Sequence, residues 1–138
     1  MFCYSHAQEE TPFEKRAHEQ LDRHRLKEQE KAVTAIKRAA QATIAKITPA
    51  LDAVSVVLGK EEMSLVAEPL REPLLTSQSI FREWVSACTH NLEVEDEARA
   101  NEIPDNKVVA VQIAASKKAI GLVCNMLSAI SRSRVLSG

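Results

Sequence analysis

The sequence is poor in glycine, cysteine and aromatic residues, and the shortages of glycine and cysteine each argue against a class of protein. Three glycines among 138 residues cannot build a phosphate-binding loop, and no GxxxxGK[ST] motif occurs. The three cysteines lie far apart without a CxxC pair, which argues against a disulfide scaffold or a zinc module. Such cysteine usage favours a reducing, intracellular and cytoplasmic setting.

The sequence also lacks an uncharged apolar run long enough to cross a bilayer, so we expect no transmembrane segment. Its first ten residues have neither the basic region nor the apolar region of an intact signal peptide. Ser5-His6-Ala7 resembles the end of a trimmed targeting segment, and this possibility stays open for residues 1–7. Residues 1–10 are expected to form a flexible tail.

What is abundant favours helices. Ala, Val, Leu, Glu and Lys dominate, and these residues lose little conformational freedom in a helix, whereas the rare glycine loses most. No stretch shows the alternation of a strand. We therefore predict an all-α protein whose residues 11–138 form a single helical-bundle domain, a usual size for one core.

The clearest pattern runs from Ala32 to Leu58, where apolar residues recur at spacings of three and four. On a helix this spacing makes one continuous apolar stripe. The stripe crosses Thr48-Pro49 without losing phase. Because proline lacks an N–H and its ring crowds the preceding turn, we expect a kink there, or a stop with a restart.

The predicted fold is an antiparallel bundle of about four helices, with a long, charged N-terminal helix. Thr11 and Glu14 are spaced as a capping box, which predicts the start of the first helix. Pro69 and Pro73 are expected to prevent a smooth helix through residues 66–73. The four helices are placed at 12–47, 49–68, 74–94 and 106–133.

The last predicted helix is apolar on two sides. One stripe contains Val109, Ile113, Ile120, Val123 and Leu127, and the other contains Val108, Val111, Ala115, Ala119, Leu122, Met126 and Ala129. Because a helix that is apolar nearly all round is usually buried, we expect this one to be central in the bundle. Lys117 and Lys118 interrupt it.

The first helix begins with a stretch that has too few apolar residues to bury a face. A helix over 12–47 would span about 54 Å at a rise of about 1.5 Å per residue, which is long for this chain. Residues 11–31 are therefore expected to project as a helical arm. The predicted partner-binding positions are Phe13, Leu21 and Leu26 on the arm, and Trp84 if its side chain is exposed.

Charge is unevenly distributed although the formal net charge is only −1. Residues 61–105 carry 3 basic and 11 acidic side chains, whereas residues 106–138 carry 5 basic and no acidic side chains. The simplest interpretation is that the two segments pack on each other. The alternative is a basic surface that binds an external anion.

No pattern indicates catalysis, a cofactor or a metal site. Glu14, His18 and Asp22 are spaced four apart and could chelate a metal ion, but a solvated charged helix face accounts for them better. Ser86, Cys88 and His90 are too close on one helix to form a nucleophilic relay. The acidic connection at 93–105 lacks the ligand spacing of a calcium loop, and whether it is a site or a spacer stays open.

These observations predict a non-enzymatic structural subunit or adaptor that assembles with a protein partner, or with copies of itself, through helix–helix contacts. The alternative is association with nucleic acid, for which a row of basic side chains is needed. Glutamates and aspartates between these basic residues weaken that alternative. The basic residues concerned are Arg23, Arg25, Lys27, Lys31, Arg132 and Arg134.

Overall fold

The computed structural model describes residues 11–137, and every regular element in this range is helical. The all-α prediction is therefore confirmed for the described residues, whereas the expected tail at 1–10 lies outside them. The described range contains three α-helices instead of the expected four. In chain order the elements are α2 (Pro12–Leu58), the 3₁₀ helix η1 (Glu61–Leu65), α3 (Glu68–Leu92), the 3₁₀ helix η2 (Glu97–Arg99) and α4 (Asn106–Ser137).

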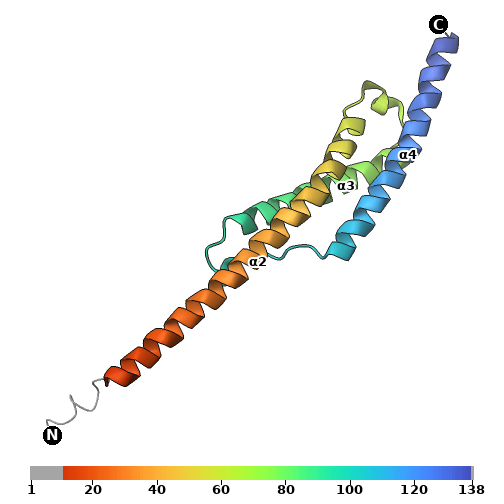
Figure 1. Cartoon of the computed structure of the whole chain (residues 1–138). Helices are drawn as coiled ribbons and strands as arrows, with labels where there is room; N and C mark the ends of the chain where they lie inside the picture. The colour runs from red at the N-terminus through yellow and green to blue at the C-terminus, as the bar shows by residue number, and fades with distance from the viewer. Residues whose placement is uncertain (1–10, 138) are drawn as a thin grey trace.

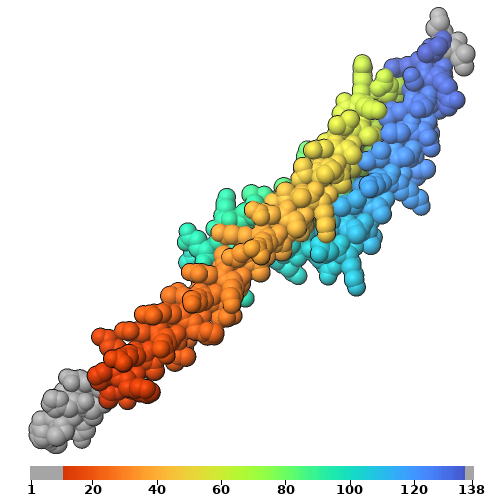
Figure 2. All heavy atoms as spheres, viewed as in Figure 1, coloured from red at the N-terminus to blue at the C-terminus, as the bar shows by residue number. Residues whose placement is uncertain are grey.

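The three α-helices form an elongated molecule (Figure 1). The second half of α2 packs against α3, which runs back in the opposite direction, and α4 then runs in the same direction as α2. The first half of α2 projects beyond the other helices, and it tapers to a single-helix rod at one end of the molecule (Figure 2). The end of α4 lies at the opposite end.

The start of α2 follows the predicted capping box. The Thr11 hydroxyl accepts a hydrogen bond from the Glu14 N–H at 3.1 Å, and the Glu14 carboxylate accepts one from the Thr11 N–H at 3.4 Å. Pro12 occupies the first turn, where its missing N–H costs no intrahelical bond. Local side-chain chemistry thus sets this boundary.

The predicted interruption at Thr48-Pro49 does not separate two helices, because α2 continues through it to Leu58. Pro49 is exposed, and it removes only one hydrogen bond from the helix, the one to the Ala45 carbonyl. Thr48 uses its hydroxyl to bond the Ile44 carbonyl at 2.7 Å. The buried residues on either side, Ile47 and Ala50, keep the same stripe in contact with the core.

The predicted boundaries around Pro69 and Pro73 are also wrong. The stretch after Gly59 forms the short 3₁₀ helix η1, and α3 begins at Glu68, six residues before the expected start at Leu74. Pro69 lies in the first turn of α3, where backbone N–H groups have no intrahelical partner. Pro73 is exposed and costs a single bond, so both prolines fit within one helix.

The core lies where the second half of α2 meets α3 and α4. Its largest fully buried side chains include Phe81, Ile47, Leu74 and Val54. A side-chain hydrogen bond joins each pair of α-helices and fixes their register. These bonds run from Gln78 to Ser55 at 3.3 Å, from Gln112 to Ser77 at 2.9 Å and from Lys46 to Asn106 at 3.4 Å.

The expectation that the last helix is central is wrong. The stripe of α4 that contains Val109, Val123 and Leu127 is buried, but large residues of the second stripe are exposed. Val111 is 70% exposed. The physical reason is the helix count: with three α-helices in the described chain, α2 and α3 cover only one side of α4.

Candidate partner-binding surfaces

The projecting first part of α2, which we call the arm (residues 12–31), is almost entirely exposed. Only Ala17 is half-buried, and the arm contains no fully buried residue. Phe13 is 80% exposed, and Leu21 and Leu26 are exposed as well. The structure thus leaves all three predicted arm positions accessible. Because they share the arm with many charged side chains, they do not form one continuous apolar face.

We expect a chain that starts at Ala32 to have a free energy of unfolding within about 1 kcal/mol of that of the full chain. The reason is that surface residues contribute little to this free energy. Trp84 is the only tryptophan and packs at the core, so its fluorescence during urea unfolding measures this quantity. Far-UV circular dichroism should show the loss of the arm's helix. A truncated chain that no longer unfolds cooperatively would show that the arm is part of the folding unit.

Trp84, the fourth predicted partner-binding residue, is half-buried. Its ring packs against the core, with its centroid 6.0 Å from that of Phe81. The sequence-based condition for Trp84 as an anchor was an exposed side chain. In the structure Trp84 lies on α3, and its partly buried ring covers the edge of the core.

The basic residues of the alternative function are divided between the two ends of the molecule. Arg23, Arg25, Lys27 and Lys31 lie on the arm, whereas Arg132 and Arg134 lie near the end of α4 (Figure 1). Lys31 is also paired with Glu28 at 3.7 Å. A single basic surface that includes both groups is therefore not present among the described residues.

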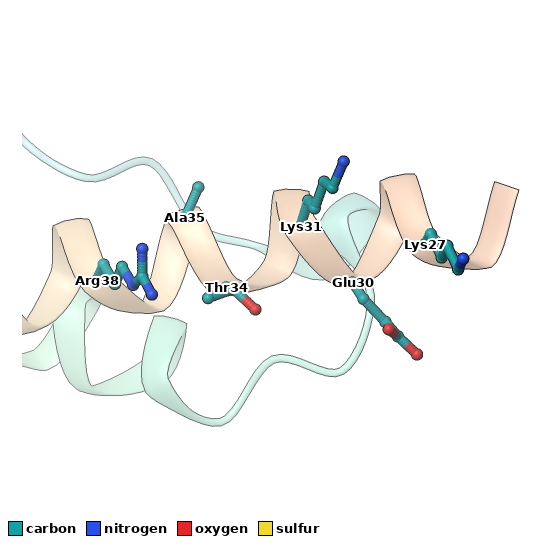
Figure 3. A pocket seen from close by; sticks show the side chains of 6 residues that line it. All are labelled: Lys27, Glu30, Lys31, Thr34, Ala35 and Arg38. Atoms are coloured by element: carbon teal, nitrogen blue, oxygen red, sulfur yellow. The ribbon is translucent and has the colours of Figure 1, made fainter. Parts of the chain in front are cut away.

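A shorter basic row does follow one side of α2. Figure 3 shows Lys27, Lys31 and Arg38 around a hollow on this side of α2, which Glu30, Thr34 and Ala35 also line. All the side chains that line this hollow come from α2, so it is the surface of one helix and not a cleft between elements. It offers three cations but no aromatic side chain for base stacking.

The acidic connection after α3 lies beside the arm. Asp96, Glu97 and Ala98 face His24, Arg25 and Glu28 across a shallow hollow. Asp96 accepts a hydrogen bond from the Ala98 N–H at 3.1 Å and thereby starts η2. The connection thus contains a short 3₁₀ helix and lies against α2.

The side chains considered for catalysis are not arranged for it. Burial raises the pKa of the Cys88 thiol, which disfavours the nucleophilic thiolate. Cys88 is buried while Ser86 and His90 are exposed. The His90 ring lies 3.3 Å from the Arg99 carbonyl oxygen, a contact that ties the end of α3 to η2.

Glu14, His18 and Asp22 do not form a metal-binding cluster. Within the described residues, no three side chains of histidine, cysteine, aspartate or glutamate come together closely enough to hold a metal ion. The face on which the three residues lie is part of the exposed arm.

An uncovered apolar surface of the described chain lies on α4. We call it the outer face of α4, and its apolar side chains are separated by three, four or seven residues, as on one side of a helix. The sequence pattern contained this stripe, but only the helix count shows that it is uncovered. Its members are Val108, Val111, Ala115, Leu122, Met126 and Ala129.

Charge on α4 is of one sign. Lys107, Lys117, Lys118, Arg132 and Arg134 are the charged residues of the helix, and none is acidic. Arg134 approaches Glu62 at 3.9 Å, and this is the ion pair that joins α4 to the acidic segment within the described residues. The acidic and basic segments do pack on each other, since α3 and η1 both contact α4, but among the described residues one ion pair joins them.

By length and composition alone, α2 and the Asn106–Val135 part of α4 could each cross a membrane. Their most apolar stretches are 28% and 22% buried, respectively. This is weak evidence, since core helices of soluble proteins have the same length and composition. The α4 stretch also has Lys117 and Lys118 in its middle, which makes a span costly.

Comparison with models of known protein families, with curated proteins and with solved structures gave no match.

Proposed function

We propose that this protein is a non-enzymatic assembly subunit or adaptor that binds protein through helix faces. The observation that carries the proposal is the outer face of α4, where residues such as Val111 and Leu122 are exposed on a helix whose opposite side is core. Exposed apolar surface of this kind marks interaction sites in soluble proteins. The exposed Phe13, Leu21 and Leu26 of the arm supply further contact positions. The predicted bundle of about four helices would be completed by helices of the partner.

The mass of the protein in its native cells tests this proposal. A tagged full chain recovered from those cells is expected in an assembly larger than the 15.3 kDa of one chain. The double variant Val111→Glu, Leu122→Glu places carboxylates on the outer face of α4 and should release a folded monomer, because burying unpaired charges is costly.

Val56→Glu is the matched control. Val56 is as exposed as Val111 but lies on α2, outside the outer face of α4, so this variant should keep the assembly. If the unmodified chain and the variants are all monomers in the native extract, the proposed function is wrong.

A further inference from the structure

The outer face of α4 is bordered by a groove that α3 and α4 form together. The groove has a volume of about 420 Å³. Its α3 wall consists of two prolines, two hydroxyl side chains and one glutamate, and its α4 wall carries Ala115, which belongs to the outer face. The lining residues are Pro69, Glu72, Pro73, Thr76, Ser77, Gln112 and Ala115.

Two glutamates of α3 and two lysines of α4 form rows of equal length. Glu72 and Glu83 are eleven residues apart, and so are Lys107 and Lys118. Eleven residues make about three turns, so each pair lies on one side of its helix, about 16 Å apart. Glu72 borders the groove, and Lys118 lies one turn beyond Ala115.

The rows also match in height along the two helices. The hydrogen bond from Gln112 to Ser77 places these residues at the same level, and the helices run in opposite directions (Figure 1). Glu72 precedes Ser77 by five residues, and Lys118 follows Gln112 by six, so both lie about 8 Å toward the same end.

The other glutamate and the other lysine are displaced by similar distances, but toward the opposite end of the two helices. Glu83 follows Ser77 by six residues, and Lys107 precedes Gln112 by five, so both lie toward the opposite end. All four side chains are exposed, and none forms an ion pair within the described chain. The chain therefore carries two matched charge rows that one copy does not use.

We infer that a second copy of this chain covers the outer face of α4, in a two-fold dimer formed by α3 and α4. The inference rests on the proposed function and names the partner. A two-fold axis parallel to the helices places α3 of one copy on α4 of the other. Rotation about this axis leaves the position of every residue along the helix direction unchanged. Each copy's Glu72 then faces the partner's Lys118, and Glu83 faces the partner's Lys107.

Such an interface is isologous, since the same two contacts occur twice. Val111, Ala115 and Leu122 lie between the charge rows and pack against the Pro73 and Thr76 side of the partner's α3. Apolar residues at the centre with charges at the edges is the usual composition of a protein interface.

Other occupants of the face fit less well. Direct pairing of two α4 helices around a two-fold axis would bring the two Lys118 side chains together, because Lys118 lies midway between Val108 and Ala129. An anionic bilayer would meet Glu72 at the edge of the groove, and α4 lacks the tryptophan and phenylalanine typical of helices that lie on membranes.

Light scattering of the purified full chain, alone in solution, tests the inference. We expect twice the 15.3 kDa of one chain at micromolar concentration. Leu122→Glu should give a folded monomer, with the Trp84 fluorescence of the unmodified protein, whereas Val56→Glu should remain dimeric.

Charge reversal tests the pairing itself. Glu72→Lys alone and Lys118→Glu alone should each raise the dissociation constant about tenfold or more, since every copy then presents like charges twice. The double variant Glu72→Lys, Lys118→Glu should restore dimerisation. If both single variants dimerise normally, or the double variant does not recover, the inferred pairing is wrong.

A purified chain that stays monomeric up to hundreds of micromolar would overturn the inference. If the native assembly still depends on Val111 and Leu122, the proposed function stands and the occupant is another protein. If the monomer instead binds vesicles that contain phosphatidylserine and Leu122→Glu abolishes the binding, a lipid surface is the occupant.

Discussion

Replacing Phe81 by alanine is expected to lower the free energy of unfolding by about 3–5 kcal/mol, as large-to-small changes of buried aromatic residues do. Phe81 is the largest fully buried side chain and is 0% exposed at the meeting point of the helices. The loss combines the apolar transfer energy of the ring with the cavity that it leaves. The total free energy of unfolding of a domain of this size is about 5–15 kcal/mol, so the variant should unfold at a much lower urea concentration than the unmodified protein.

Trp84 fluorescence is the appropriate measurement, since its ring lies beside Phe81 and it is the only tryptophan. Circular dichroism would also report the helix of the arm, which contributes no residue to the core. Phe13→Ala is the control, because the same substitution at an 80% exposed position should change the free energy of unfolding by less than about 0.5 kcal/mol. If Phe81→Ala lowers the free energy of unfolding by less than about 1 kcal/mol, Phe81 does not lie in the core.

Local signals in the sequence predicted the features that depend on neighbouring residues. The start of α2 follows from Thr11 and Glu14, and the start of α4 at Asn106 follows from the acceptor side chain of Asp105, which bonds the Lys107 N–H at 2.7 Å. The exposure of Phe13, Leu21 and Leu26 followed from the surplus of charge around them. These are short-range properties, so one sequence is enough to read them.

Features that depend on packing were misjudged. Proline at 49 or 73 costs a helix one hydrogen bond, which suggested interruptions, but the buried stripes on either side continue in phase and outweigh that cost. Ile47 and Ala50 are buried on either side of Pro49, and Leu70 packs against the core before Pro73 as Leu74 does after it. Local propensity alone does not separate a continuous helix from an interrupted one at these prolines, and the tertiary contacts decide for the continuous helix.

The outer face of α4 could not be predicted because exposure depends on how many helices surround it. The second apolar stripe was visible in the sequence, but four helices would have covered it. With α2 and α3 as the only α-helical neighbours in the described chain, Val111 and Leu122 stay exposed. The matched spacing of Glu72, Glu83, Lys107 and Lys118 gained meaning only once Gln112 and Ser77 fixed the register.

Pro49→Ala is expected to raise the free energy of unfolding by about 1–3 kcal/mol. Proline inside a helix is about 3 kcal/mol less favourable than alanine, because it removes a hydrogen bond and crowds the preceding turn. Exposure of Ala45 lets its carbonyl bond water, which lowers the gain. Pro49 is itself exposed, so alanine at this position leaves no cavity in the core. Urea unfolding followed by Trp84 fluorescence measures the change.

Pro69→Ala is the matched control, since Pro69 is also exposed but lies in the first turn of α3, where no intrahelical donor is required. Its substitution should change the free energy of unfolding by less than about 0.5 kcal/mol. A gain at Pro49 without one at Pro69 means that the cost of proline is an interior hydrogen bond, tolerated because the stripe of α2 must remain continuous. Equal effects at both positions would instead indicate that α2 is interrupted at Pro49 in solution, as the local sequence alone suggests.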